Sequence, residues 1–223
     1  MTFAASAPSR LTAAMLRQAP ILPRDFFSRD PVTVGRELLG KLLIRREGRK
    51  LLAGRIVEDE AYLGQHDPAA HAFAGKTPRN FVLFGPPGHA YVYFIYGNHY
   101  CLNVSCMPDG DGEGVLFRAM EPVFGLEAMA RAREIDLPPS PRPTQLRMIS
   151  SGPGRMSEAL GITRVRDNNK DLTSAKSDLW FADDGFRPER IVATARIGIT
   201  KAVERPLRFV IAGNAYVSGK KMG

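Results

Sequence analysis

The feature that most constrains the fold is a pair of strand-like runs that meet at Gly97-Asn98. The run HAYVYFIY precedes this dipeptide and HYCLNVSC follows it, so β-branched and aromatic residues dominate both sides. Glycine followed by asparagine suits a two-residue turn, in which the backbone adopts positive φ angles. We therefore predict an antiparallel β-hairpin whose tip is formed by Gly97 and Asn98.

Other segments supply the remaining strands and helices. Apolar patterning predicts further strands over 51–64, 115–122, 191–199 and 206–213. A helix is predicted over 125–134, a glycine-rich turn that leads into a short helix over 151–162, and a helix running into a strand over 36–46. Four prolines predict a loop over 136–145. Strands without regularly intervening helices are typical of the α+β class. We expect a single mixed domain with a curved, largely antiparallel β-sheet, flanking helices and a protruding hairpin.

The length of 223 residues suits one domain over 21–223, preceded by a flexible basic leader over 1–20 that includes one short helix. No apolar run reaches the roughly 18 residues of a membrane span. Two cysteines, Cys101 and Cys106, are too few for a disulfide framework and are expected to be buried, inert thiols. We expect a cytoplasmic monomer without membrane contact, associated with the nucleoid in a bacterium or located in the nucleus of a eukaryote.

The charge distribution favours a polyanionic partner. Lysine and arginine number 31 against 23 acidic residues, which gives a formal net charge of +8. Residues 36–55 hold seven basic and two acidic side chains, and an acidic group that includes Glu58, Asp59, Glu60 and Asp67 follows. A negative spot within a positive surface indicates chemistry on a bound polyanion, with nucleic acid as the first candidate. The alternative is that the excess charge only aids solubility.

The acidic group lies in a predicted strand, IVEDEAY. Alternation along a strand places Ile56, Glu58, Glu60 and Tyr62 on one face and Asp59 on the other. Two carboxylates beside an aromatic ring can take a proton from water or stabilise a developing cation. An edge strand carrying solubilising acids would show the same pattern, so the segment alone does not decide between the two.

Aromatic, histidine and glycine residues add to the pattern. Tyr91, Tyr93 and Tyr100 can stack on nucleobases or pack in a core, whereas Tyr96 lies next to the predicted turn, where it can wedge into a base stack. His66 and His71, with Asp67 between them, match no familiar metal spacing and favour a binding loop. The segment SGPGR at 151–155 suits a DNA phosphate contact as well as a plain helix start.

Eight ordered motifs resemble the alkyladenine (3-methyladenine) DNA glycosylase family, from about Leu22 to Ser218. They are RIVEDEAYLG, DPAAHAF, TPRN, YVYFIYG, CLNVS, LFRAMEP, SGPG and PLRFVIAGNAYVS. The resemblance implies a monofunctional enzyme that flips alkylated or deaminated purines out of duplex DNA and hydrolyses the N-glycosidic bond. It implies neither a metal nor an organic cofactor, and it implies one mixed α/β domain with a curved antiparallel sheet.

The resemblance also implies a role for particular positions. Glu60 matches the general base that orients and deprotonates water, Arg118 the arginine that holds this water and the target's phosphate, and Ile197 a main-chain position beside the water. The base-contacting positions of the family are matched by Tyr62, His71, Tyr93 and Asn103. Asn103 is the one that disfavours the exocyclic amine of a normal guanine.

Contacts with the rest of the DNA are implied in the same way. Tyr96 matches the side chain that enters the gap left in the duplex, and the family's backbone contacts fall at Arg79, Arg133 and Arg155. The chain departs from the usual pattern with His99 in place of tyrosine, arginine in place of lysine at 155, and Ala215 in place of proline. An arginine keeps the charge but changes the geometry of a phosphate contact.

One geometric problem and two competing functions remain at this point. Across a strict two-residue turn, Tyr93 and Asn103 face opposite sides of the hairpin, so a bulge or strong twist is needed if both line one pocket. A non-catalytic nucleic-acid-binding domain would also be basic and rich in tyrosine. A metal-dependent nuclease could use Glu58, Glu60 and Asp67.

Overall fold

Strand β2 is the longest element and lies inside the sheet, with partners along both edges. The computed structural model describes residues 11–95 and 97–219. In this part of the chain the strands are β1 (Leu42–Glu47), β2 (Lys50–Tyr62), β3 (Ala90–Ile95), β4 (His99–Cys106), β5 (Glu113–Phe124), β6 (Leu179–Ala182), β7 (Ile191–Thr194) and β8 (Arg208–Ile211). The α-helices are α1 (Ala13–Gln18), α2 (Arg24–Phe27), α3 (Pro31–Leu38), α4 (Leu126–Ala132), α5 (Pro143–Ser150), α6 (Pro153–Ala159) and α7 (Arg164–Asp167). Two 3₁₀ turns, η1 (Gly64–His66) and η2 (Phe81–Phe84), complete the set.

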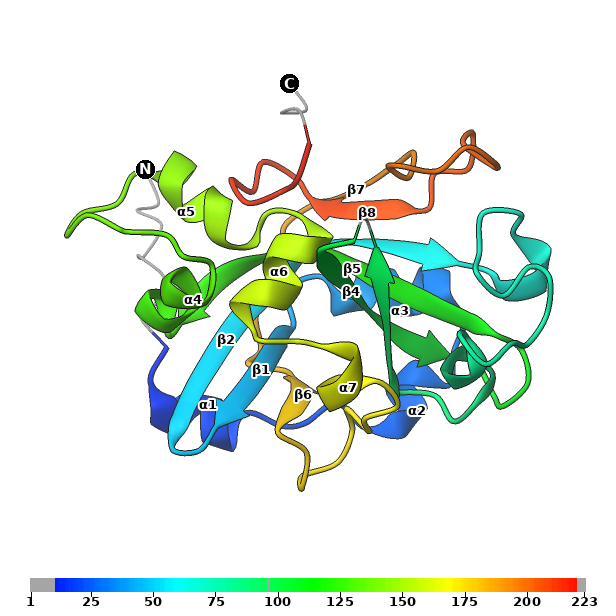
Figure 1. Cartoon of the computed structure of the whole chain (residues 1–223), viewed down its shortest axis with the longest axis horizontal. Coiled ribbons are helices and arrows are strands. Elements are labelled where there is room, and N and C mark those ends of the chain that lie inside the picture. The colour runs from blue at the N-terminus through cyan, green and yellow to red at the C-terminus, as the bar shows by residue number, and fades with distance from the viewer. Residues whose placement is uncertain (1–10, 96, 220–223) are drawn as a thin grey trace, which may run out of the picture.

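The strands form one antiparallel sheet in the order β3-β4-β5-β2-β1-β6. Strand β8 pairs with the second half of β2 and with β7, and the two run across the end of the sheet at the top of Figure 1. Helix α3 packs against β2, and α6 packs against β4 and β5. The α+β class is therefore confirmed, and residues 58–60 of β2 lie between β5 and β8.

Most of the predicted elements are present with shifted ends. The strand predicted over 191–199 stops at Thr194, and the rest of the segment is irregular. The loop predicted over 136–145 is also partly wrong, because α5 begins at Pro143. Proline is well tolerated at the first helical position, since its missing N–H would have no partner there. Strand β6 and the short helices α2 and α7 were not predicted.

The hairpin of β3 and β4 has a different register from the one predicted. Ile95 pairs with His99, so three residues separate the last pair, where a two-residue turn leaves only two. Tyr93 pairs with Cys101 and Tyr91 with Asn103. Because directly paired residues project to the same face, Tyr93 and Asn103 share one side without any bulge. Tyr96 lies outside the described residues.

Two of the register shifts of β2 occur where its acidic residues begin. Its register with β5 shifts between Ile56 and Glu58 and again between Glu58 and Asp59. Ile56 and Val57 are both buried in the main core, so strict alternation fails at this bulge. Glu58 and Glu60 nevertheless reach the same arginine, while Asp59 lies against α3 and Phe209 on the other face. A bulge bends a strand locally and re-aims its side chains.

Residues 11–20 of the predicted leader include the expected short helix, α1. Leu16 of this helix is buried in a cluster with Leu42, Ile44 and Trp180. This part of the leader is therefore packed against the sheet. Among the described residues, no helix has both the length and the apolar character that a membrane crossing requires.

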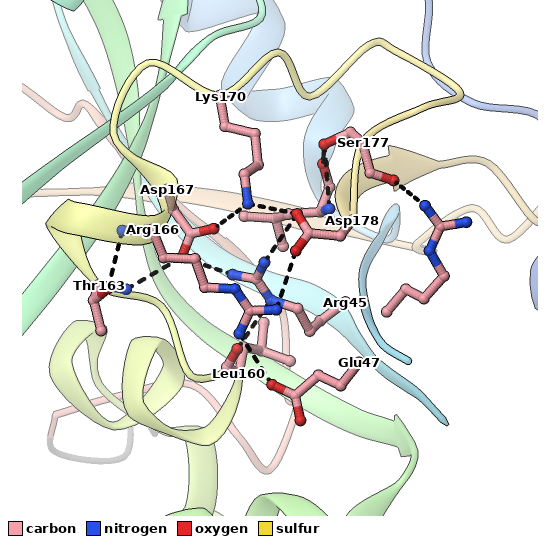
Figure 2. Close-up of polar contacts among 11 residues, drawn as sticks. Arg45, Glu47, Leu160, Thr163, Arg166, Asp167, Lys170, Ser177 and Asp178 are labelled. Atoms are coloured by element: carbon pink, nitrogen blue, oxygen red, sulfur yellow. Dashed lines mark hydrogen bonds and ion pairs between the residues drawn. The ribbon is translucent and has the colours of Figure 1, made fainter. Parts of the chain in front are cut away.

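A buried ion network ties α7 to strand β1 (Figure 2). Arg45 of β1 is fully buried, and its Nη2 lies 2.8 Å from Oδ2 of Asp167, which is also fully buried. Its Nε donates to the carbonyl of Leu160, and Lys170 contacts the other carboxylate oxygen of Asp167. The segment that follows α7 pairs with β3 through Asn169 and Lys170. The network thus holds the chain that borders the hairpin.

We expect Arg45→Met to lower the free energy of unfolding by about 3–5 kcal/mol, because it leaves the Asp167 carboxylate buried with a poorer charge balance. Chemical denaturation of both proteins measures this difference. Arg166→Met is the matched control, since Arg166 joins the same network from the surface, with 35% of its side chain exposed. It should change stability by less than about 1 kcal/mol. Equal effects of the two substitutions would contradict the account.

Candidate active site

A cavity of about 620 Å³ lies between the hairpin of β3 and β4 and the loops around residues 68–71 and 197–201. This volume is within the range of small-molecule sites, about 300–1,000 Å³. Its lining comes from strands β2 to β5, from two loops around residues 68–71 and 197–201, and from residues 152–155, which include the first turn of α6. Seven of the predicted site residues line it directly: Tyr62, His71, Tyr93, Asn103, Arg118, Arg155 and Ile197. The hairpin register described above is what brings Tyr93 and Asn103 to this shared cavity.

Aromatic side chains form one wall of the cavity. The rings of His71 and Tyr93 meet edge to face with centroids 4.5 Å apart, and His71 Nδ1 lies 2.9 Å from the hydroxyl of Tyr91. Burial, with the positive charge of Arg79, lowers the pKa of His71 although part of its surface is open to solvent. Burial likewise raises the pKa of Tyr93. These groups therefore present neutral, flat surfaces at neutral pH.

Asn103 also lines the cavity. Its Nδ2 donates to the carbonyl of Tyr91 at 3.1 Å, and only 7% of the residue is exposed. This hydrogen bond fixes the orientation of the amide from within the hairpin. Cys101, two residue pairs closer to the tip, also lines the cavity, and burial raises the pKa of its thiol. The prediction that Cys101 and Cys106 are buried is confirmed.

Glu60 is fully buried directly behind the cavity lining. Its Oε1 accepts from the main-chain N–H of Ile197 at 2.8 Å, and its Oε2 accepts from the hydroxyl of Tyr62 at 2.9 Å. Arg118 Nη1 lies 3.2 Å from Oε1. Three groups that hold the carboxylate thus line the cavity, although Glu60 itself does not. Burial, with the charge of Glu60, raises the pKa of Tyr62, so its phenol keeps the proton that it donates.

Arg118 connects two carboxylates and a carbonyl. Its Nε donates to Glu58 at 3.1 Å, and its Nη1 points to Glu60 and, at 3.5 Å, to the carbonyl of Ile197. Burial opposes its charge, but Glu60 and Glu58 outweigh this effect and raise the pKa of Arg118. Without this arginine, Glu60 would lose its ion pair and carry an uncompensated charge in a dry site.

The three arginines predicted to contact the DNA backbone lie in different surroundings. Arg79 is exposed, with its guanidinium 5.7 Å from the ring centroid of Tyr93, and Arg155 lines the cavity. Arg133 does not line the cavity and forms an ion pair with Glu158. The structure therefore brings Arg79 and Arg155 to the cavity region and leaves Arg133 outside it.

Arg196 is a buried residue of this site that the sequence did not reveal. Its guanidinium pairs with both oxygens of Asp67, donates to the carbonyl of Ala61 at 3.0 Å, and lies 4.6 Å from the ring centroid of Tyr62. It therefore joins the loop that carries Ile197 to β2. The sequence predicted a strand over 191–199 and gave no sign of this role. In the structure the strand ends at Thr194, and Arg196 lies in the irregular segment that follows.

Carboxylates that a metal ion would need are engaged by arginines here. Glu58 contacts Arg118 and Arg208, and Asp67 contacts Arg196. Among the described residues, no cluster of three acidic, histidine or cysteine side chains has the arrangement of a metal site. The geometry instead suits a carboxylate that binds and orients a small nucleophile at the edge of an aromatic cavity.

Known proteins resemble this chain over most of its length. Residues 25–215 match the model of the family described as "Methylpurine-DNA glycosylase (MPG)". A relative from Koribacter versatilis, named "Putative 3-methyladenine DNA glycosylase", is 63% identical over 206 residues, which cover 92% of this chain and 97% of the relative. Relatives of the same name from Burkholderia cenocepacia and Methanoculleus marisnigri are each 49% identical, over 89% and 88% of this chain and 91% and 98% of theirs.

The protein is thus a DNA glycosylase, a hydrolase of N-glycosyl compounds with DNA as its substrate. More particularly, the chain belongs to the methylpurine-DNA glycosylase family.

Asp59 provides a test of the burial described here. Both of its carboxylate oxygens are buried without a hydrogen-bond partner among the described residues, and burial, with the charges of Glu58 and Glu60, raises its pKa well above 3.8. The folded state therefore binds a proton that the unfolded chain releases near pH 4. Wild-type stability is lost as the pH rises above that point.

We expect Asp59→Asn to be more stable than the wild type at pH 7 and to lose this advantage as the pH falls to about 4. Denaturation of both proteins across this pH range measures the difference, in which the other titrating groups cancel. An advantage that grows on acidification would show that Asp59 is charged in the folded protein.

Proposed function

We propose that this glycosylase removes alkylated or deaminated purines, of the 3-methyladenine, 7-methylguanine and hypoxanthine types, from duplex DNA. Glu60 activates the water that hydrolyses the N-glycosidic bond, and the product is the abasic site with which base excision repair begins. The single observation that carries this proposal is the buried Glu60 carboxylate, held by Tyr62, Arg118 and the Ile197 N–H at the edge of an aromatic cavity.

The cavity receives a purine that has left the helix. Unstacking a nucleotide costs a few kcal/mol, and the cost is smallest for a damaged, weakly paired base. Stacking against Tyr62, His71 and Tyr93 recovers part of this cost. An alkylated purine that carries positive charge gains a further cation–π attraction of about 0.5–2 kcal/mol from the tyrosine faces. Damaged bases are therefore favoured before any bond breaks.

Hydrolysis then breaks one bond and forms another at the sugar. The water oxygen attacks C1′ while the C1′–N9 bond breaks and its electron pair leaves with the base. Glu60 accepts the proton of the water, and its negative charge favours the oxocarbenium character that develops on the sugar. The carbonyl of Ile197 and the guanidinium of Arg118, 3.5 Å apart, offer an acceptor and a donor for the same water.

Cations near the cavity bind the phosphates of the flanking nucleotides. Arg79 and Arg155 are exposed there, so each can neutralise a phosphate and contribute to a salt-dependent affinity. We assign Tyr96 to the gap that the flipped nucleotide leaves and Arg133 to a more distant backbone contact. The reaction requires no cofactor, and one copy of the chain carries every residue that the proposal names.

We expect Glu60→Gln to reduce release of hypoxanthine from a duplex by at least about 10²-fold, because the amide cannot accept the proton of the water. Its affinity for the same duplex should stay within about twofold, since the amide keeps the size of the side chain. Free base is measured by chromatography under single-turnover conditions, and binding by fluorescence anisotropy.

A panel of duplexes that each contain one modified purine, assayed with and without EDTA, provides the control. Release of free base by the wild type, unchanged by the chelator, supports the proposal. Strand cleavage that EDTA abolishes would support a metal-dependent nuclease, and binding without release would support a non-catalytic DNA-binding domain. Excision by Glu60→Gln at the wild-type rate would rule out the assigned base.

A further inference from the structure

Glu58 is a fully buried carboxylate for which the mechanism above gives no task. It lies two residues before Glu60 on the same face of β2 and accepts four hydrogen bonds. Its Oε1 accepts from Arg118 Nε at 3.1 Å, Arg208 Nε at 2.7 Å and the hydroxyl of Ser218 at 2.9 Å. Its Oε2 accepts from the main-chain N–H of Ser218. A carboxylate so completely bonded holds its neighbours rigidly.

We propose that Glu58 is a positioning residue of the reaction, which aims Arg118 at Glu60 and divides the charge of this arginine between the two carboxylates. The inference rests on the proposed function of Glu60. It concerns Glu58 and its supports, Arg208 and Ser218, none of which needs to touch the substrate.

The planar guanidinium of Arg118 links its contact with Glu58 to its contact with Glu60. The Nε of Arg118 is fixed by Glu58, and because the group is rigid and flat, this bond also fixes the direction of Nη1. Nη1 then lies 3.2 Å from Glu60 Oε1 and 3.5 Å from the carbonyl of Ile197. Without Glu58, Arg118 could rotate about its side chain and give up either contact.

The supports of Glu58 come from the C-terminal part of the chain. Arg208 lies on β8 and pairs in register with Glu60, and its Nη2 donates to the carbonyl of Ser218 at 3.2 Å. Ser218 lies beyond residue 215, where the match to the family model ends, and only 6% of it is exposed. The segment after β8 therefore closes the back of the active site.

Glu58 and Glu60 are both fully buried and share Arg118 as a partner, so the charge of Glu58 acts on Glu60 through this arginine. The charged and titratable groups on that side of Glu60 are Glu58, Tyr62, Cys101, Arg118, Arg196 and Arg208. Asp59 projects to the opposite face. Removal of the negative charge of Glu58 leaves the positive charge of Arg118 to act on Glu60 alone.

The experiment compares wild type, Glu58→Gln, Glu58→Asp and Asp59→Asn in single-turnover release of hypoxanthine from pH 4.5 to 9. We expect Glu58→Gln to lower the maximal rate about 10- to 100-fold and to move the acidic limb of the pH profile down by about one unit. Affinity for the duplex should stay within about twofold. Glu58→Asp, which keeps the charge but shortens the side chain, should lose rate and keep the wild-type limb.

Asp59→Asn is the matched control, because it removes the adjacent carboxyl of the same strand without touching Arg118. It should keep the maximal rate of the wild type and the acidic limb of its pH profile. Ser218→Ala removes one hydrogen bond to Glu58 and tests the inference if Glu58→Gln does not fold. We expect its rate to fall about two- to tenfold with unchanged affinity, since one bond of a charged group is lost.

Two results would overturn the inference. One is a Glu58→Gln or Ser218→Ala protein with the maximal rate and the pH profile of the wild type. The other is an Asp59→Asn protein whose pH profile moves as far as that of Glu58→Gln. Because the wild type and Glu60→Gln are measured on the same duplex, these results are distinguishable from a failure of the proposed function, in which the wild type itself releases no base.

Discussion

The proposed active site depends on one buried charge arrangement, in which the guanidinium of Arg118 lies between the carboxylates of Glu58 and Glu60. Two like charges on one strand cannot remain ionised in a dry interior unless a cation compensates them and every remaining oxygen finds a donor. Here the donors come from Tyr62, from the loop at Ile197 and from Ser218. The sheet therefore has to bring β5, β8 and two irregular segments to the same point of β2.

This requirement explains why the site consists of strand residues backed by loops. β2 is bonded on both edges over residues 58–60, so its carboxylates cannot move with the thermal motion of a surface loop. The loops supply main-chain groups, such as the N–H of Ile197, whose position is fixed by the buried Arg196–Asp67 pair. Catalytic groups held within a few tenths of an ångström need such support from a second layer of bonds.

Sequence patterns were sufficient for the parts of the fold that obey local rules. The hairpin, β2 and α6 follow from residue composition and periodicity, and the shared face of Glu58, Glu60 and Tyr62 follows from alternation. Arg196 and Ser218 could not be found in this way, because their roles arise from contacts between segments far apart in the chain. The register of the hairpin was missed for a different reason: Gly97-Asn98 is typical of a two-residue turn, but the pairing of the strands is decided by which side chains the sheet buries.

The odd number of residues between Ile95 and His99 has a consequence for how this hairpin can vary. Because side chains alternate along each strand, adding or removing a single residue there would turn the β4 side chains relative to those of β3. Tyr93 and Asn103 would then lie on opposite sides of the ribbon, and the cavity would lose one of its walls. Any change of length that keeps both side chains in the cavity must therefore come in steps of two residues, so the tip can become longer or shorter without changing what the strands below it present to the cavity.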